Sequence, residues 1–315
     1  MIMKILSKLK EICKYFYHFG LKLGLVEIIQ LFIIRNESTS LGKKIYKIKH
    51  QIIQKRIYNT NIDIINKYKK MNRKKNSKIK DNCYIFICWW QGIENMPTIV
   101  KICIKSILKK YDNNRVKIIT KNNYTDFVNI PEHILLKYQK KYISIAHFSD
   151  ILRMMLLDKY GGIWIDATIF LERPLNKQIY EYSFYTVHHC LYSEYHVCQG
   201  KWMTSFLASG KDNLMIKFIL EMLLSYWKNE NIAIDYFFLD DIIAIGYKNF
   251  DEFKKMIDDV PINNTNTDKL QGKLDLPYNE SEWNELTKED YIFKTTYKKE
   301  YKNSDGTYYN HLKKD

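Results

Sequence analysis

The sequence lacks the patterns that mark several common protein classes. None of its six cysteines lies in a C-x-x-C pair, so reduced, buried thiols are expected. Two nearby stretches, His188-His189-Cys190 and His196 with Cys198, resemble a metal cluster, but their spacing matches no standard zinc motif. No RNA-recognition, KH, zinc-finger or helix-turn-helix pattern is present, so nucleic acid is not an expected partner. No internal repeat occurs.

A long apolar run is missing from the first part of the chain. Within residues 1–34, the uncharged run Ile28–Ile34 is much shorter than the about 20 apolar residues that a spanning helix needs. Lys22 and Glu27 interrupt the apolar region, and no small-residue cleavage site follows, so no cleavable signal is expected. Lysines alternate there with apolar residues at helical spacing (Ile5, Leu6, Leu9, Ile12, Cys13 and Phe16). This pattern predicts either a helix at a membrane interface or one that packs on the protein, and the interface is favoured.

Acidic residues are scarce in the same region. Residues 1–80 contain 20 lysines and arginines and 4 acids, against 30 basic and 31 acidic residues in the rest of the chain. The net charge of +15 therefore lies entirely in residues 1–80. A segregated basic segment indicates contact with an anionic surface. We expect a helical extension at 1–80, an α/β core at 81–260 and a polar tail at 261–315, in a cytoplasmic protein on the inner face of the cell membrane.

Apolar runs that alternate with amphipathic stretches predict the core. Continuous apolar runs are typical of strands covered on both faces. Strands are expected at Cys83–Cys88, Val116–Ile119, Ile163–Ile165 and Phe184–Val187, and helices at Lys43–Lys70, Pro97–Lys110, Pro131–Lys140, Ser149–Tyr160, Asn213–Trp227 and Tyr236–Tyr247. This order predicts a mostly parallel sheet flanked by helices. The tail is Asn-rich, and little core is expected in it.

Charged residues interrupt the apolar pattern between residues 146 and 168. Arg153 is the one polar residue in Ile151–Leu157, and burying it beside Asp150 is costly unless both find partners. Gly161-Gly162 ends the helix, and Asp166 follows the next strand at its carboxyl end, where ligands bind in open α/β sheets. Alternatively, Ser149 is an N-cap and Asp150 a first-turn acid paired with Arg153. That alternative does not account for Asp166.

The run S-D-I-L-R, followed by Y-G-G-I-W-I-D, resembles the sugar-nucleotide motif of family 32-type glycosyltransferases. It is most similar to bacterial capsular polysaccharide synthesis proteins, and the likeness extends loosely from about Tyr84 to about Pro174. The resemblance implies a GT-A fold, with a Rossmann-like sheet. It also implies transfer of a hexose, with retention, from a nucleotide-diphosphate donor such as a UDP-sugar to a lipid-linked oligosaccharide. The alternatives are a non-catalytic docking scaffold and a sugar- or polyol-phosphate transferase.

The resemblance also assigns roles to individual residues. Asp150 and Arg153 would bind the donor sugar and diphosphate, and Asp166 would hold Mn²⁺ or Mg²⁺. Trp90 would stack on the nucleotide base, and Trp164 would lie against the ribose or base. Gly162 of the same motif would also contact the nucleotide. Trp164 could equally be ordinary core, since it alternates with two isoleucines.

One acid of the family pattern is missing. The usual Asp-x-Asp reads Asp166-Ala167-Thr168 here, so Thr168 would offer a hydroxyl to the metal, or a cationic side chain would replace part of the metal's charge. His311 is expected to close over the diphosphate and add a metal ligand. Asp241 or its neighbour Asp240 would orient the acceptor hydroxyl, although an acid in the first turn of a helix explains both equally well.

Overall fold

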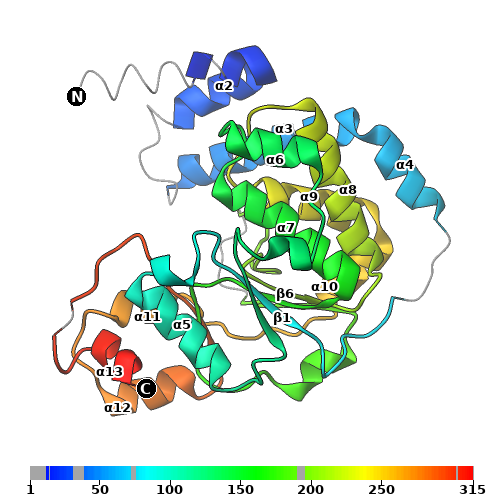
Figure 1. Ribbon diagram of the computed structural model, residues 1–315. Helices are drawn as coiled ribbons and strands as arrows, with labels where there is room; N and C mark the ends of the chain where they lie inside the picture. Colours follow the sequence, from blue (N-terminus) through cyan, green and yellow to red (C-terminus); the bar gives the residue numbers. More distant parts are fainter. Residues whose placement is uncertain are drawn as a thin grey trace.

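The computed structural model describes residues 12–13, 15–30, 39–71, 76–189, 196–302 and 304–314. A five-stranded sheet in the order β2-β1-β3-β6-β5 forms its centre, with helices on both faces (Figure 1). Strands β2, β1 and β3 run parallel, whereas β6 is antiparallel to both β3 and β5. The predicted α/β class with a mostly parallel sheet is confirmed, and the sheet is mixed at one side.

The strands of the central sheet are β1 (Ile85–Cys88), β2 (Val116–Ile119), β3 (Gly162–Ile165), β5 (Phe184–Thr186) and β6 (Phe206–Ser209), and a second sheet pairs β4 (Ile169–Leu171) with β7 (Ile292–Lys294). The helices are α2 (Leu21–Ile28), α3 (Ser40–Thr60), α4 (Ile62–Lys70), α5 (Thr98–Leu108), α6 (Glu132–Gln139), α7 (Ile145–Tyr160), α8 (Leu214–Asn229), α9 (Phe238–Asn249), α10 (Asp251–Asp258), α11 (Lys269–Lys273), α12 (Glu280–Thr287) and α13 (Tyr308–Lys314).

The order of the strands creates a topological switch point between β1 and β3. The chain leaves β1 through α5 to reach β2 on one side, and then returns through α6 and α7 to β3 on the other side. Right-handed crossovers in opposite directions place α5 and α7 on opposite faces of the sheet, as Figure 1 shows. The two connections therefore run in opposite directions from β1 and β2, and ligands usually bind beside the carboxyl ends of the strands at such a switch point.

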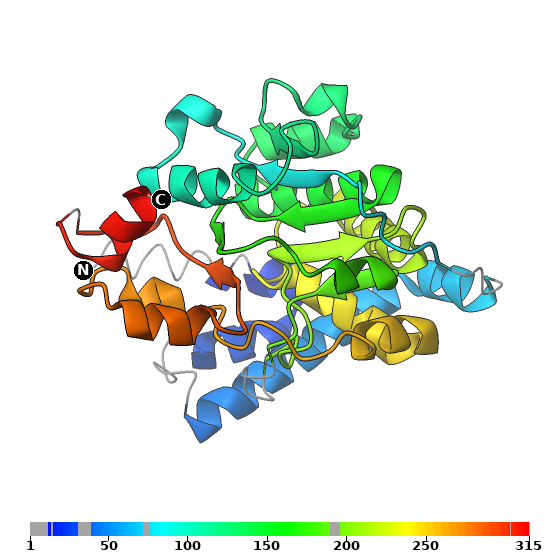
Figure 2. The same cartoon turned by 90° about the horizontal axis from the view of Figure 1, so that it is seen from below.

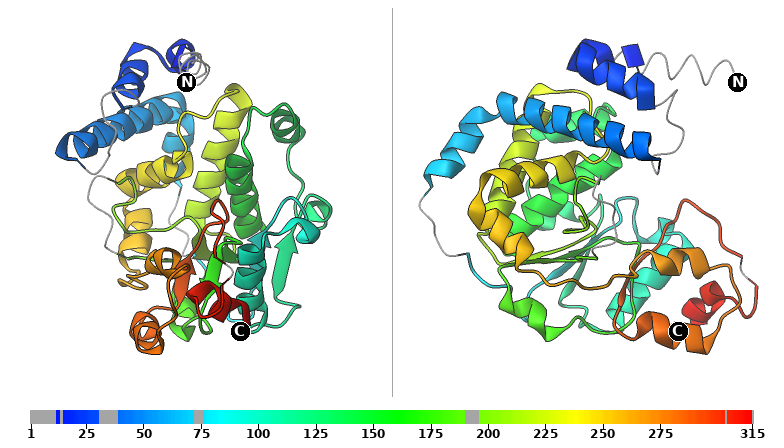
Figure 3. Two further views of the ribbon diagram at one scale, coloured as in Figure 1. Left: turned by 90° about the vertical axis from the view of Figure 1, so that its left-hand side faces the viewer. Right: turned by 180° about the vertical axis from the view of Figure 1, so that it is seen from behind.

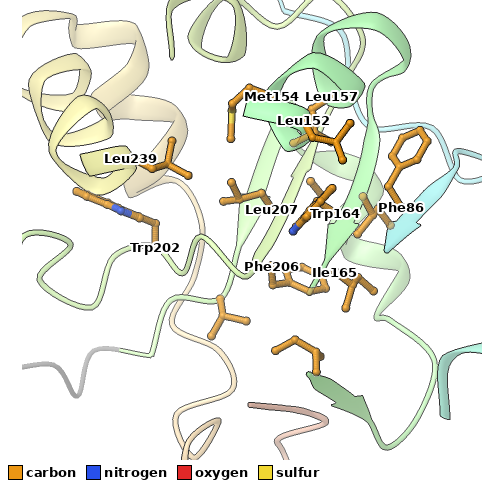
Figure 4. Packing of buried hydrophobic residues seen from close by; sticks show 14 of the residues in the cluster. Phe86, Leu152, Met154, Leu157, Trp164, Ile165, Trp202, Phe206, Leu207 and Leu239 are labelled. Carbon is orange, nitrogen blue, oxygen red and sulfur yellow. The ribbon is translucent and has the colours of Figure 1, made fainter. Parts of the chain in front are cut away.

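Helix α7 covers the middle of the sheet with its apolar side chains. Trp164 of β3 is 1% exposed and lies below Leu152 and Leu157 of α7, next to Leu207 of β6 (Figure 4). Fully burying a side chain of this kind contributes on the order of 2–3 kcal/mol. This packing fixes the position of the strand that ends at Asp166.

Helix α7 begins earlier than the alternative with Ser149 as its N-cap requires. The N-cap is Ser144, whose side chain accepts a hydrogen bond from the backbone N–H of His147, and not Ser149. Asp150 consequently lies in the second turn of the helix, beyond the strongest influence of the helix dipole. First-turn stabilisation therefore does not explain why an acid occupies this buried position.

The two glycines after α7 serve a close approach between strands. Gly161 has φ 65° and Gly162 has φ 103°, both in the region that side chains disfavour. A Cβ at Gly162 would also lie 2.5 Å from the carbonyl oxygen of Tyr84, just before β1. Gly162, predicted as a nucleotide-binding residue, is buried in the sheet, and its requirement for glycine comes from packing against the β1 backbone.

The amino-terminal helices pack on the core. Helix α3 lies along α9 and α4 lies along α8 (Figure 3). The buried face of α3 includes Lys49 and His50, which short-range periodicity does not predict. Lys49 lies 2.8 Å from both Glu27 and Asp235, so the charge is compensated inside the protein.

Part of the predicted interfacial helix, including Ile5, Leu6 and Leu9, lies outside the described residues, and Ile12 within them is buried. Among the helices that the structure describes, none is long and apolar enough to cross a membrane.

The carboxyl-terminal segment contains more core than its composition predicts. Its elements α11, α12, β7 and α13 gather at one end of the molecule beside α5 (Figure 2). Five apolar residues there are fully or almost fully buried: Leu270, Leu274, Ile292, Phe293 and Tyr308. The expectation of little core was wrong because β7 finds its partner in β4, more than a hundred residues earlier in the chain.

Candidate active site

Asp166 lies at the carboxyl end of β3, at the switch point between β1 and β3. Its backbone N–H donates to the carbonyl oxygen of Ser205, which aligns the residue with the neighbouring strand. Oδ1 accepts hydrogen bonds from Trp164 Nε1 at 2.8 Å and from Arg153 at 3.1 Å. Oδ2 accepts one from Lys294 Nζ at 2.7 Å. The side chain is still 26% exposed, so the carboxylate remains open to a ligand.

Arg153 connects the two acids that the sequence singles out. Its side chain is 5% exposed, and it bridges Asp166 and Asp150, the latter at 2.7 Å from Nη1. The guanidinium carbon lies 4.9 Å from the ring centre of Trp164, which is within range of a cation–π contact. The structure thus brings together Asp150, Arg153, Trp164 and Asp166, as the motif predicts.

The electrostatics of the two acids differ. Burial would raise the pKa of Asp166, but Lys294 and Arg153 outweigh it and hold that pKa below its ordinary value. Burial raises the pKa of Asp150, although Arg153 opposes the rise. Asp166 is therefore a firmly ionised group at neutral pH, whereas Asp150 depends on Arg153 for its charge.

Two tryptophans follow the carboxyl end of β1, the strand next to β3. Trp89 is buried and contacts the exposed Tyr297 edge to face, with ring centres 5.2 Å apart. Trp90 is half-buried and packs on Tyr124 and Phe148. One of the pair enters the core, as strand alternation requires, and the ring of Trp90 is held at the edge of the sheet. Its contact with a nucleotide base stays a prediction.

The acidic pair at the start of α9 divides between two environments. Asp241 is fully enclosed, and it accepts hydrogen bonds from His50 at 2.9 Å and Gln54 at 2.8 Å. It joins α9 to α3 and cannot reach a substrate, which corrects its assignment as a catalytic residue. Asp240 instead accepts a hydrogen bond from Trp202 Nε1 at 2.9 Å. Burial raises the pKa of Asp240 to about 7, and the carboxylate of Asp150 adds to the rise.

The family of the chain is decided by its sequence over nearly its whole length. The sequence model of the capsular polysaccharide synthesis proteins matches residues 34–312, which include every residue of this site. The chain belongs to the capsular polysaccharide synthesis protein family. No curated protein matches it. Among solved structures, the PaToxG glycosyltransferase aligns with 81% of this chain and 99% of its own, at 16% identity and a TM-score of 0.38.

The residues expected to bind a divalent metal in this family member do not form a metal site. Both oxygens of Asp166 already face cationic groups. Thr168 is buried, and its carbonyl oxygen accepts hydrogen bonds from the N–H and hydroxyl of Thr295. His311 stacks on Tyr278 in the carboxyl-terminal segment, with ring centres 3.8 Å apart. The donor set at Asp166 is therefore one carboxylate with its charge compensated, which suits a hard divalent cation poorly.

A second group of possible metal ligands lies elsewhere. Within the described part of the chain, His50, Asp235 and Asp241 are the one cluster of histidines, cysteines and acids close enough together to share an ion. Lys49 already contacts Asp235, and Gln54 contacts Asp241, so protein groups occupy the positions around these oxygens. The cluster links α3 to the start of α9.

Sequence reasoning missed Lys294 and Tyr236 as members of the site. Lys294 ends β7 and contacts Asp166 across 128 positions of sequence. Tyr236 is exposed just before α9, and its ring lies edge to face with His147 at the start of α7, with ring centres 6.5 Å apart. In the sequence, Lys294 is a lysine that follows the short apolar run Tyr291–Phe293. That pattern does not indicate a site residue, and only the pairing of β7 with β4 places Lys294 beside Asp166.

Proposed function

We propose that this capsular polysaccharide synthesis protein is a glycosyltransferase. It transfers a sugar from a nucleoside-diphosphate donor, with a UDP-sugar as the first candidate, to a lipid-linked glycan acceptor. The observation that carries the proposal is the linked set Asp150, Arg153 and Asp166 at the switch point between β1 and β3. Family membership agrees with this role.

The chemistry of transfer matches the charges around Asp166. A leaving diphosphate needs positive charge close to the bond that breaks, and the sugar hydroxyls need acceptors that hold the anomeric carbon in place. Lys294 is the cation of the cluster with access to solvent, since its side chain is 28% exposed and that of Arg153 is 5% exposed. The carboxylates of Asp150 and Asp166 supply acceptors for donor hydroxyls.

Asp240 is the group proposed to orient the acceptor. An ionised carboxylate accepts a hydrogen bond from the attacking hydroxyl and aligns it with the anomeric carbon. Asp240 takes this role in place of Asp241 because Asp241 is fully enclosed beside His50 and Gln54. The charge of Asp150, a residue of the proposed donor site, also helps to raise the pKa of Asp240. Transfer with retention is kept as part of the proposal, with the acceptor attacking on the face from which the diphosphate leaves.

The test of the proposal is nucleotide binding followed by product analysis. Calorimetric titration of the purified protein with UDP, GDP and CDP should show tight binding of one nucleotide. Incubation with the matching nucleotide sugars and a lipid-linked acceptor should then yield a glycosylated lipid. A phosphorylated sugar or polyol product would indicate the phosphate-transferase alternative. A folded protein that binds no nucleotide would favour the non-catalytic scaffold.

The pKa of Asp240 predicts the pH dependence of transfer. Because burial raises this pKa to about 7, the residue is largely protonated at pH 6 and ionised at pH 8. The wild-type kcat/KM should therefore rise with pH through about 7. Asp240→Asn should lose about 100-fold in rate and should lack this ascending limb. Rate profiles between pH 5.5 and pH 8.5 check the expectation. An unchanged ascending limb in Asp240→Asn would assign it to another group.

The basic amino-terminal region is proposed to dock on an anionic membrane. Helix α2 exposes Leu21 and Leu25, which are four residues apart and so lie on one face. Apolar side chains that enter the lipid boundary, with lysines near the headgroups, are typical of interfacial helices. The surrounding excess of positive charge favours anionic lipids over neutral ones.

Vesicle sedimentation tests this docking. The protein should bind vesicles that contain phosphatidylglycerol and should remain in solution with pure phosphatidylcholine. The double variant Leu21→Glu and Leu25→Glu should weaken binding by about 10-fold or more, because two buried apolar side chains are lost and two negative charges are added. Leu276→Glu changes an exposed leucine of the tail and is the matched control. Equal binding by all three proteins would contradict the proposal.

A further inference from the structure

The cation beside Asp166 comes from the protein itself. Lys294 Nζ lies 2.7 Å from Oδ2 of Asp166, and the lysine is the last residue of β7. The resemblance implies a divalent metal at this aspartate, yet the residues around it do not fit one. The position that faces the carboxylate is taken by an ammonium group.

Backbone contacts on both sides hold Lys294 in place. It pairs with Ile169 in the β4–β7 ladder, only three residues after Asp166. Its own N–H donates to the carbonyl oxygen of Thr267, and the next residue, Thr295, donates twice to the carbonyl oxygen of Thr168. The turn that carries Asp166 and the strand that carries Lys294 are thus joined as one unit, which preorganises the ion pair.

The ammonium group can serve a second partner. It has three N–H donors, of which Asp166 accepts one. With 28% of its side chain exposed, Lys294 can direct its remaining donors toward a ligand bound beside Asp166. A lysine binds phosphate as a compact positive charge, which is what a leaving diphosphate requires. A divalent cation could enter only by displacing this lysine, and Arg153 would repel it.

We propose that Lys294 takes the place of the divalent cation at the donor diphosphate, so that this protein binds its nucleotide donor without metal. The inference rests on the proposed function. Asp166 then acts mainly by orienting Lys294 and Arg153 toward the phosphates. The same arrangement explains how the site operates with threonine where related enzymes have their second aspartate.

The experiment compares nucleotide affinity with and without metal. The protein is treated with EDTA and titrated calorimetrically with UDP, GDP and CDP, in EDTA and then in Mn²⁺. Affinity for the bound nucleotide should agree within about 3-fold between the two conditions. Lys294→Met should weaken that affinity in EDTA by about 30-fold, which is the loss expected for one charge-assisted hydrogen bond and its ionic attraction.

Two further variants separate charge from structure. Lys294→Arg keeps the positive charge and should retain affinity within about 5-fold of wild type. Lys298→Met removes an exposed lysine from the same segment and should leave affinity unchanged. Thermal unfolding confirms that each variant is folded.

Binding that disappears in EDTA and returns with Mn²⁺ would overturn metal independence while supporting the glycosyltransferase. Unchanged affinity in Lys294→Met would likewise overturn the role of the lysine. Failure to bind any nucleotide in either condition would overturn the proposed function, and this inference with it.

Discussion

Asp166→Asn should reduce sugar transfer by about 1,000-fold or more while the protein stays folded. Asparagine keeps the shape of the side chain but removes the negative charge that holds Lys294 and Arg153 at the carboxyl end of β3. Arg153 keeps Asp150 as a partner, and Lys294 is partly exposed, so neither cation is left buried without compensation. The expected loss is in catalysis more than in folding.

The measurement combines kcat/KM for transfer, nucleotide affinity and thermal unfolding. Glu172→Gln is the matched control, since Glu172 directly follows the next strand, β4, and its side chain is 27% exposed. It should retain transfer within about 3-fold, because its carboxylate pairs with Arg173 and not with the site. A folded Asp166→Asn protein with normal biological function would favour the scaffold alternative.

The pH dependence of the free energy of unfolding tests independently whether the ion pairs of Asp166 stabilise the fold. Because its folded-state pKa is lower than its ordinary value, its ion pairs contribute stability above the unfolded pKa. That contribution is lost as the pH falls through the folded-state pKa. Wild-type protein should therefore lose more stability than Asp166→Asn between pH 7 and strongly acidic pH, as measured by urea unfolding.

Arg153→Met should destabilise the protein by about 3–5 kcal/mol, the usual cost of removing one partner from a buried ion pair. The guanidinium is nearly enclosed and contacts both Asp150 and Asp166, so its removal leaves two carboxylates in a poorly solvated site. The contact with the ring of Trp164 is lost as well. Urea unfolding at neutral pH measures the change in free energy.

Companion variants test the cause of this destabilisation. Adding Asp150→Asn to Arg153→Met should recover about 1 kcal/mol or more, because the carboxylate left without its partner is removed. Arg173→Met is the control, since this arginine is 38% exposed and its ion pair with Glu172 lies at the surface. It should change stability by less than about 1 kcal/mol. An Arg153→Met protein as stable as wild type would show that the bridge contributes little to the fold.

The sequence alone determined the central part of the fold and the centre of the site. Strands β1, β2, β3 and β5 and helices α5, α7, α8 and α9 form near their predicted positions because each depends on a local pattern of apolar residues. The cluster at Asp166 also depends on a local pattern in the sequence. Its members Asp150 and Arg153 lie on α7, and Asp166 follows β3, so all three fall within 17 residues and short-range geometry brings them together.

Tertiary structure decided which other residues join that cluster. Asp240 and Asp241 are neighbours in sequence, but consecutive residues of a helix point about 100° apart. The packing of α9 on α3 turned Asp241 toward His50, whereas the carboxylate of Asp240 accepts a hydrogen bond from Trp202. No local pattern records this choice, because His50 lies 191 positions earlier in the chain.

Lys294 is the clearest case of what only the tertiary structure decided. Its place against Asp166 follows from the pairing of β7 with β4, a contact between strands separated by more than a hundred residues. Short strands of three residues carry little periodic signal, and their pairing depends on how the rest of the chain has already packed. The sequence thus determined where the acidic centre lies, and long-range packing determined which cation faces it.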